Sequence, residues 1–99
     1  MHAVVNHLPL QKSTDWAELA RKFEAFEPML RENPGFRGYA LMRAGDDAAI
    51  LVVTFDTREA LDAISRNVAA PGFAEKVRPL LAGAAARSVA EVIAGSALR

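Results

Sequence analysis

One polar side chain interrupts the first apolar segment of the chain, where it could take part in chemistry. Asn6 lies in the middle of Ala3–Leu10, a short segment that is β-branched at its centre and contains a proline near its end. A buried carboxamide without hydrogen-bond partners costs about 1 to 3 kcal/mol. Asn6 therefore either bonds a neighbouring backbone group or faces a wet pocket, and the residues alone leave both alternatives open.

A second group of candidate residues alternates along a later segment. Arg37, Tyr39, Leu41 and Arg43 occupy every second position, so a strand would place them on one face. A tyrosine between two arginines could bind an anionic aromatic molecule, because a guanidinium group pairs with oxygen and stacks on rings. The alternative is that these charges are solvated and protect an edge strand from aggregation.

The histidines and the absent cysteines limit the remaining chemistry. His7 should point away from Asn6, because successive side chains of a strand alternate. We expect it to be a hydrogen-bonded interface residue, with a general base as the alternative. No second histidine or carboxylate stands beside it at metal-ligand spacing, so no metal site is predicted. Without cysteine, disulfides and thiolate catalysis are excluded.

Four strands are predicted to position these residues, at Ala3–Leu10, Phe36–Ala44, Ala48–Phe55 and Arg87–Ala94. The chain from Gly95 onward is expected to be a tail. The turn before the third strand is Gly-Asp-Asp, whose residues tolerate the positive φ of tight turns.

Two amphipathic helices are predicted between the strands. Asp15 with Glu18 has capping-box spacing and begins the first helix, in which Pro28 should cause a kink or interruption near Ala25. The second helix has the same cap spacing at Asp56 and Glu59, and it should be interrupted at Ala70-Pro71-Gly72 before a further helical piece. Trp16 is expected to pack at the entrance of the first helix. The apolar residues expected to form the core, and to line any cavity beneath the helices, are Phe23, Phe26, Ile64, Phe73 and Val77.

The order β-α-β-β-α-β predicts an α+β fold of the ferredoxin-like class, an antiparallel sheet with both helices on one face. In this topology the first and third strands are central and the second and fourth are edges. The third, Ala48–Phe55, is apolar at nearly every position, which indicates burial on both faces. Because the helices cover only one face, we expect a second copy of the chain to cover the other, giving a homodimer.

Composition excludes several other partners. Of the 99 residues, 52% are hydrophobic and 24% charged, which is ordinary for a folded domain. Twelve basic and twelve acidic residues give a net charge of zero without basic blocks, so nothing attracts nucleic acid or anionic lipid. No apolar run approaches the ~20 residues of a membrane span, and no leader peptide is recognisable. We expect a cytoplasmic protein.

Three segments together resemble a known family: Asn6–Lys12, Glu32–Tyr39 with its Pro-Gly-Phe turn, and Val53–Leu61. The chain resembles dimeric α/β-barrel proteins of the antibiotic biosynthesis monooxygenase type over its whole length, as a single domain spanning residues 1–99. The resemblance implies a homodimer with a small apolar pocket between sheet and helices in each subunit. An asparagine of the first strand faces that pocket in the haem-degrading branch of the family, and Asn6 matches its position.

The resemblance also implies a function. We expect a monooxygenase without cofactor, metal or flavin that oxidises an aromatic or quinol-type small molecule, with Asn6 stabilising negative charge on a substrate oxygen. The residues expected to contact the substrate are Phe23, Arg37, Tyr39, Ile64, Phe73 and Val77. The alternative is a non-catalytic dimer of the same fold, with a binding or structural role. Haem degradation is disfavoured because the tryptophan and histidine of that branch would fall near Ala63 and Val77.

Overall fold

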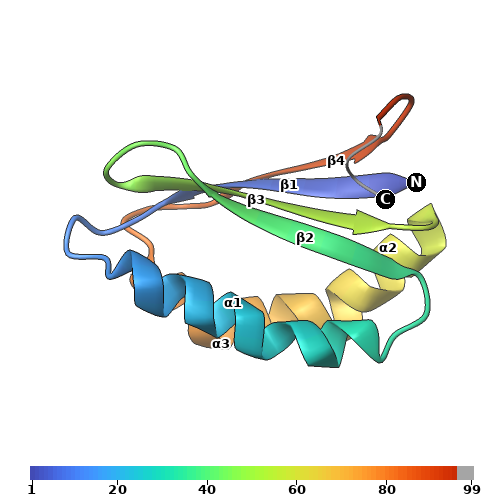
Figure 1. Cartoon of the computed structure of the whole chain (residues 1–99), viewed down its shortest axis with the longest axis horizontal. Coiled ribbons are helices and arrows are strands. Elements are labelled where there is room, and N and C mark those ends of the chain that lie inside the picture. Colours follow the sequence, from blue (N-terminus) through green and yellow to red (C-terminus); the bar gives the residue numbers. More distant parts are fainter. Residues whose placement is uncertain (96–99) are drawn as a thin grey trace.

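Strands and helices follow one another in the order of a split βαβ arrangement. The computed structural model describes residues 1–95. Its elements are β1 (His2–Pro9), α1 (Trp16–Arg31), β2 (Phe36–Arg43), β3 (Ala48–Phe55), α2 (Arg58–Ile64), a π-helical turn η1 (Ser65–Ala69), α3 (Ala70–Lys76), a short 3₁₀ helix η2 (Arg78–Leu80) and β4 (Ala86–Glu91). Figure 1 shows the sheet as one layer and the helices as a second layer beneath it.

The sheet has the strand order β2-β3-β1-β4, and every pairing is antiparallel. The predicted central and edge positions of the strands are confirmed, and so is the ferredoxin-like α+β class. Within residues 1–95 the sheet is not closed. Closure into a dimeric barrel would need a second copy of the chain, and it remains a prediction.

Helix α1 begins as predicted and ends later than its proline suggested. The backbone N–H of Glu18 donates to Asp15 Oδ1 at 3.1 Å, which satisfies one free donor of the first turn. The expected interruption by Pro28 is absent, because α1 continues to Arg31. Pro28 stands in the last turn, where little helix remains to be disturbed, and an ion pair between Arg31 and Glu27 (2.6 Å) spans it.

The helical arm from α2 to α3 departs from the prediction twice. Thr57, rather than Asp56, caps α2, and its hydroxyl accepts from the N–H of Ala60 at 3.1 Å. The predicted interruption around Pro71 is also wrong, because the chain stays helical from α2 through η1 into α3. Pro71 lies at the start of α3, directly after the π-helical turn η1, where the α-helical hydrogen-bond pattern is already interrupted. A Cβ at Gly72 would lie 2.4 Å from the ring of Phe26, so glycine permits close packing of α3 against α1.

Strand β4 is shorter than the predicted Arg87–Ala94, since it ends at Glu91. The predicted tail begins at Gly95, and its remaining residues lie outside the described part of the chain. No described helix is long and apolar enough to cross a membrane.

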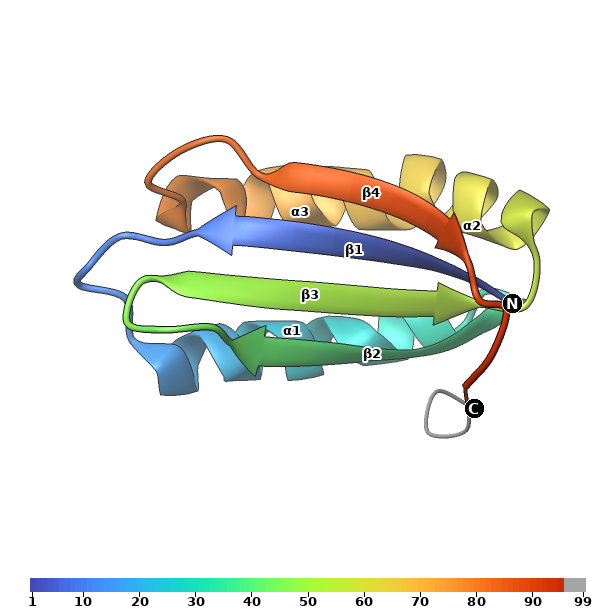
Figure 2. The same ribbon diagram turned by 90° about the horizontal axis from the view of Figure 1, so that it is seen from above.

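The sheet has one face on the helices and one face without cover. Helix-facing side chains such as Leu8 and Phe55 are only 1% exposed and pack against Leu19 and Leu61. Besides the row Gly38, Thr54, Ala3 and Ala90, in which Ala3 and Thr54 are buried, the opposite face carries two cross-strand rows, and Figure 2 shows that no helix lies in front of it. We call these two rows the open face: Ala40, Val52, Val5 and Ser88 in one, and Met42, Ile50, His7 and Ala86 in the other.

Candidate functional site

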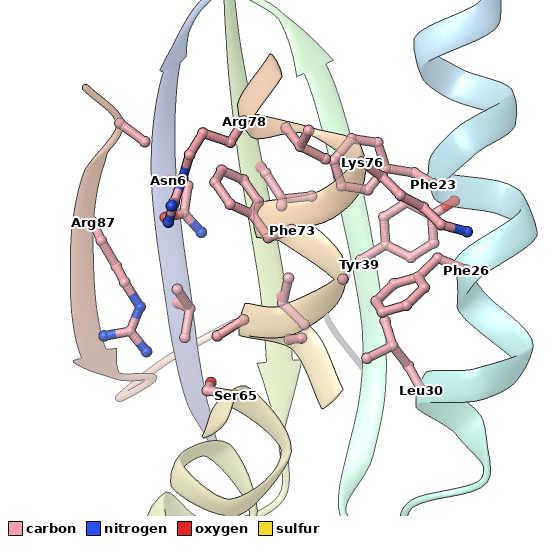
Figure 3. A pocket seen from close by; sticks show the side chains of 18 of the residues that line it. Asn6, Phe23, Phe26, Leu30, Tyr39, Ser65, Phe73, Lys76, Arg78 and Arg87 are labelled. Carbon is pink, nitrogen blue, oxygen red and sulfur yellow. The ribbon is translucent and has the colours of Figure 1, made fainter. Parts of the chain in front are cut away.

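A cavity of about 590 Å³ lies between the sheet and the helices. Its volume falls in the range of small-molecule sites, roughly 300 to 1,000 Å³. All four strands contribute to one wall, β4 through Arg87, while α1 and the helical arm provide the other (Figure 3). The cavity therefore lies where the resemblance placed the pocket.

Aromatic rings dominate the lining of this cavity. Phe23 and Phe26 come from α1, Phe73 from α3, and Tyr39 and Phe55 from the sheet. The rings of Phe23 and Tyr39 have centroids 6.3 Å apart at an interplanar angle of 31°. Rings in such offset arrangements pack well against a further planar ring system.

Asn6 stands on the cavity wall in the central strand β1. It pairs with Leu51 of β3 on one side and Arg87 of β4 on the other. Its side chain is partly exposed, and within residues 1–95 it makes no protein hydrogen bond. Of the two alternatives left open by the sequence, the structure favours the pocket-facing one, so the amide N–H groups can donate to a ligand.

His7 lies on the open face, is exposed, and does not line the cavity, in agreement with its predicted direction. The structure thus places neither histidine where it could act on a molecule bound beside Asn6, because His2 is not on the cavity wall either. In the part of the chain that the structure describes, no three histidine or carboxylate side chains gather as metal ligands.

Tyr39 remains a neutral hydrogen-bond donor over a wide pH range. Burial, and then the nearby charges of Glu27 and Glu24, raise the pKa of its phenol above the ordinary value of 10.0. A neutral phenol can donate a hydrogen bond to a ligand oxygen, whereas a phenolate could not.

Titration of the single tyrosine tests this environment. Because folding raises its pKa, Tyr39 contributes stability that is complete below pH 10 and is lost as the pH rises through the folded-state pKa. Phenolate absorbance of the native protein should rise at a higher pH than that of the protein unfolded in denaturant. Glu27→Gln should bring the native midpoint down only in part, because burial is the larger cause. A native midpoint at or below the unfolded one would contradict the prediction.

Two of the predicted substrate-contacting residues lie away from the cavity. A β-bulge between Phe36 and Gly38 interrupts the regular alternation on which the prediction relied for Arg37. Its Nη1 instead donates to Asp56 Oδ1 at 2.7 Å. Ile64 is 3% exposed and belongs to the core beneath β1 and β3. Neither lines the cavity, so the structure does not support their predicted contact with a substrate.

The arginine that shares a face with Tyr39 is also engaged elsewhere. The guanidinium carbon of Arg43 lies 4.7 Å from the centre of the Trp16 ring, near the start of α1. Its Nη2 lies 3.5 Å from Asp46 Oδ1. Arg37 and Arg43 thus each pair with a carboxylate of the same chain, and neither lines the cavity beside Tyr39. Phe23, Tyr39, Phe73 and Val77 do line the cavity together with Asn6, and their roles toward a substrate remain predictions.

Sequence reasoning missed a set of basic residues on the cavity wall. Arg87 could have been found, because it alternates with Val89 in β4 and so faces the helices beside Asn6. The others follow α-helical or irregular geometry that no periodicity revealed. The basic residues on the wall are Lys22, Arg66, Lys76, Arg78 and Arg87.

The profile of the antibiotic biosynthesis monooxygenase family matches residues 1–69, more than two thirds of the sequence. The chain belongs to this family. The resemblance noted in the sequence is thereby confirmed. No curated protein matches the chain significantly.

Solved structures share the fold of this family member at low sequence identity. A protein of unknown function from Nitrosomonas europaea is 16% identical with a TM-score of 0.79, over 96% of this chain and 91% of that one. SnoaB from Streptomyces nogalater, a cofactor-independent oxygenase, is 16% identical with a TM-score of 0.76, over 95% and 94%. The haem-degrader MhuD from Mycobacterium tuberculosis, with two haems bound in its active site, is 21% identical with a TM-score of 0.74, over 97% and 99%. At these identities the likeness concerns the fold alone.

Most side-chain ligands of haem iron are missing from the cavity of this family member. No histidine, cysteine or methionine lines it among the described residues, and the phenol of Tyr39, whose pKa is raised, stays protonated. Val77, near the position where the histidine of the haem-degrading branch was expected, is buried and apolar. A haem held through such a ligand therefore does not fit this chain.

Proposed function

We propose that the protein is a cofactor-independent monooxygenase that oxidises an electron-rich aromatic or quinol-type molecule bound in the cavity. One observation carries the proposal: an aromatic-lined cavity of about 590 Å³ presents, on its central strand, the amide of Asn6 without a protein hydrogen bond among residues 1–95. Membership of the antibiotic biosynthesis monooxygenase family and the fold shared with SnoaB support the same reaction class.

The substrate itself would supply the electrons for this reaction. Loss of a proton gives a phenolate or enolate, which reduces dioxygen; one oxygen atom enters the product and the other leaves as water. Asn6 would donate a hydrogen bond to the substrate oxygen and stabilise its negative charge in a site largely shielded from water. Phe23, Phe26 and Phe73 would hold the ring system in place.

The wall offers little to a reaction that needs a side-chain base. Asp62 is the one carboxylate on the described wall, and the Nε of Arg58 lies 3.1 Å from its Oδ1. A substrate of this enzyme must therefore be acidic enough to ionise with help from hydrogen bonds and nearby positive charge. The lack of a free side-chain base on the described wall also favours a second candidate function, in which the protein binds the aromatic molecule without converting it.

We also propose that the protein acts as a homodimer joined through the open face. Val5, Ile50 and Val52 form its centre, and Met42, which is 44% exposed, extends it toward β2. Apolar sheet surface of this kind is rarely left uncovered in soluble proteins. A symmetric copy would cover it with the same surface.

Oxygen uptake tests the proposed reaction. Protein is incubated with a panel of hydroquinones, dihydroxynaphthalenes and anthrones, and uptake is compared with that of heat-denatured protein to correct for autoxidation. We expect at least one compound to be oxidised faster than the control, with one atom of labelled dioxygen in the product. Binding of the panel without turnover would favour the second candidate.

Titration with haem tests whether the protein instead acts like the haem-degrading branch of the family. With no histidine, cysteine or methionine on the described wall, we expect no saturable shift of the haem absorbance band. Saturable binding at one haem or more per subunit, followed by loss of the band with a reductant and oxygen, would contradict the proposed substrate class.

A further inference from the structure

Most of the lysines and arginines that form no ion pair among residues 1–95 lie on the cavity wall. Arg31, Arg37, Arg43 and Arg58 each pair with a carboxylate. Seven other lysines and arginines of residues 1–95 form no ion pair within that range, and five of them are the basic residues of the cavity wall. Only Lys12 and Arg21 lie elsewhere. The unpaired cations are thus concentrated at one site of a chain whose net charge is zero.

These side chains reach the cavity wall from five elements, α1, η1, α3, η2 and β4. Arg87 stands on β4 directly across from Asn6 in the strand register. Arg78 follows α3 in η2, and Figure 3 shows it with Asn6 and Arg87 on the β1–β4 side of the cavity, while Phe23 and Phe26 lie on the α1 side. Arg78 and Arg87 therefore lie with Asn6 at one end of the cavity, whereas Lys76 lies near Phe23 and Tyr39 at the other (Figure 3).

Solvated surface charge is the simplest explanation of any single one of these residues, since most of them are exposed. Solvation does not explain why four arginines elsewhere pair with carboxylates while the five basic residues of the cavity wall form no ion pair among residues 1–95. A concave site with cationic side chains and low-dielectric walls concentrates anions. Guanidinium groups bind carboxylates and similar oxyanions through paired N–H donors and also stack on rings.

We infer that the ligand of the cavity is an aromatic molecule carrying an anionic group such as a carboxylate. Its rings lie among Phe23, Phe26 and Phe73, and its anion lies at the rim, bound by Arg78 and Arg87. This inference rests on the proposed function, because it assumes that the cavity takes a small aromatic molecule. In this inference Arg78 and Arg87 bind the anion, in place of the Arg37 and Arg43 that the sequence suggested.

Two fluorescent probes of almost the same shape test the inference. Anilinonaphthalene sulfonate carries an anionic group, and N-phenyl-1-naphthylamine lacks it; both fluoresce in apolar sites. Each is titrated into the wild-type protein, Arg78→Gln, Arg87→Gln and the double variant. Arg21→Gln is the matched control, because it removes the same charge from an exposed position outside the cavity. The variant Ala69→Trp fills the cavity, and any signal that persists in it is subtracted as binding to another surface.

We expect the sulfonate to bind more tightly than the neutral probe. Each single variant should raise the Kd of the sulfonate about fivefold and the double variant about twenty-fold, while the Kd of the neutral probe and both values in Arg21→Gln stay unchanged. Sodium chloride should weaken binding of the sulfonate alone. Equal affinity for the two probes, or equal affinity of wild type and double variant for the sulfonate, overturns the inference and leaves the proposed function standing. Failure of both probes to bind the cavity would count against the proposed function as well.

Discussion

Val52→Asp is expected to convert the protein from a dimer into a folded monomer. Val52 lies at the centre of the open face, paired with Val5 of β1 and Ala40 of β2. In a symmetric dimer the substitution buries two carboxylates against apolar residues, at a cost of several kcal/mol for each. The dimer should therefore weaken by at least about a thousandfold. Sedimentation velocity over a range of protein concentrations measures the change.

The control for this prediction introduces an aspartate in the helical layer, away from the open face. Ala17→Asp adds a carboxylate in the first turn of α1, at an exposed position where a negative charge is compatible with the helix. It should leave the dimer intact. Circular dichroism measures whether Val52→Asp still folds. If that variant is unfolded, Val5→Asp tests the same row of the open face. A wild-type protein that is monomeric at micromolar concentrations would refute the proposed dimer, as would a Val52→Asp variant that dimerises as tightly as the wild type.

Most of the fold could be predicted from the sequence, because hydrophobic periodicity and turn residues report directly on it. The unbroken apolar run of β3 identified a central strand, and the order of elements then left one antiparallel topology. The cap of α1 at Asp15 was also recognisable, since it depends on a local side-chain to backbone bond.

Predictions failed where tertiary packing decides between local alternatives. Pro71 and Gly72 are usual helix breakers, yet α3 contains both: Pro71 directly follows the π-helical turn η1, and Gly72 leaves room for the ring of Phe26. Asp56 was expected to cap α2, but it pairs with Arg37 and leaves the cap to Thr57. Neither arrangement can be read from residues that are neighbours in sequence.

The candidate site was predictable where strand alternation or the apolar stripe of a helix applies, as Phe23 and Phe73 show for the helices. Asn6 and Tyr39 were placed correctly on the helix-facing side, since a strand fixes the direction of each side chain. The role of Arg37 could not be judged from alternation, because a β-bulge interrupts the strand there and bulges leave little trace in a single sequence. The basic residues of the cavity wall were missed because they come from five elements that meet only in the folded chain.

Asn6→Ala is expected to abolish most of the turnover of any substrate found in the oxygen-uptake panel. Loss of one hydrogen-bond donor to a developing oxyanion lowers kcat about 100- to 1,000-fold, or roughly 3 to 4 kcal/mol. Asn6→Asp should be slower still, because a carboxylate would repel the substrate anion. The matched control is Asn67→Ala, which removes the same carboxamide from an exposed position of η1 outside the cavity wall and should keep full activity.

A readout independent of turnover distinguishes loss of charge stabilisation from damage to the fold. A chromogenic phenol bound beside Asn6 should have a lowered pKa, because the hydrogen bond from the amide N–H stabilises the phenolate more than the neutral phenol. In Asn6→Ala that pKa should rise by about one unit, the equivalent of roughly 1.4 kcal/mol, while thermal stability changes little because Asn6 makes no protein hydrogen bond among residues 1–95. An Asn6→Ala protein with wild-type kcat and an unchanged phenol pKa would assign the asparagine a structural role, and the chemistry would then have to reside in the basic residues of the cavity wall.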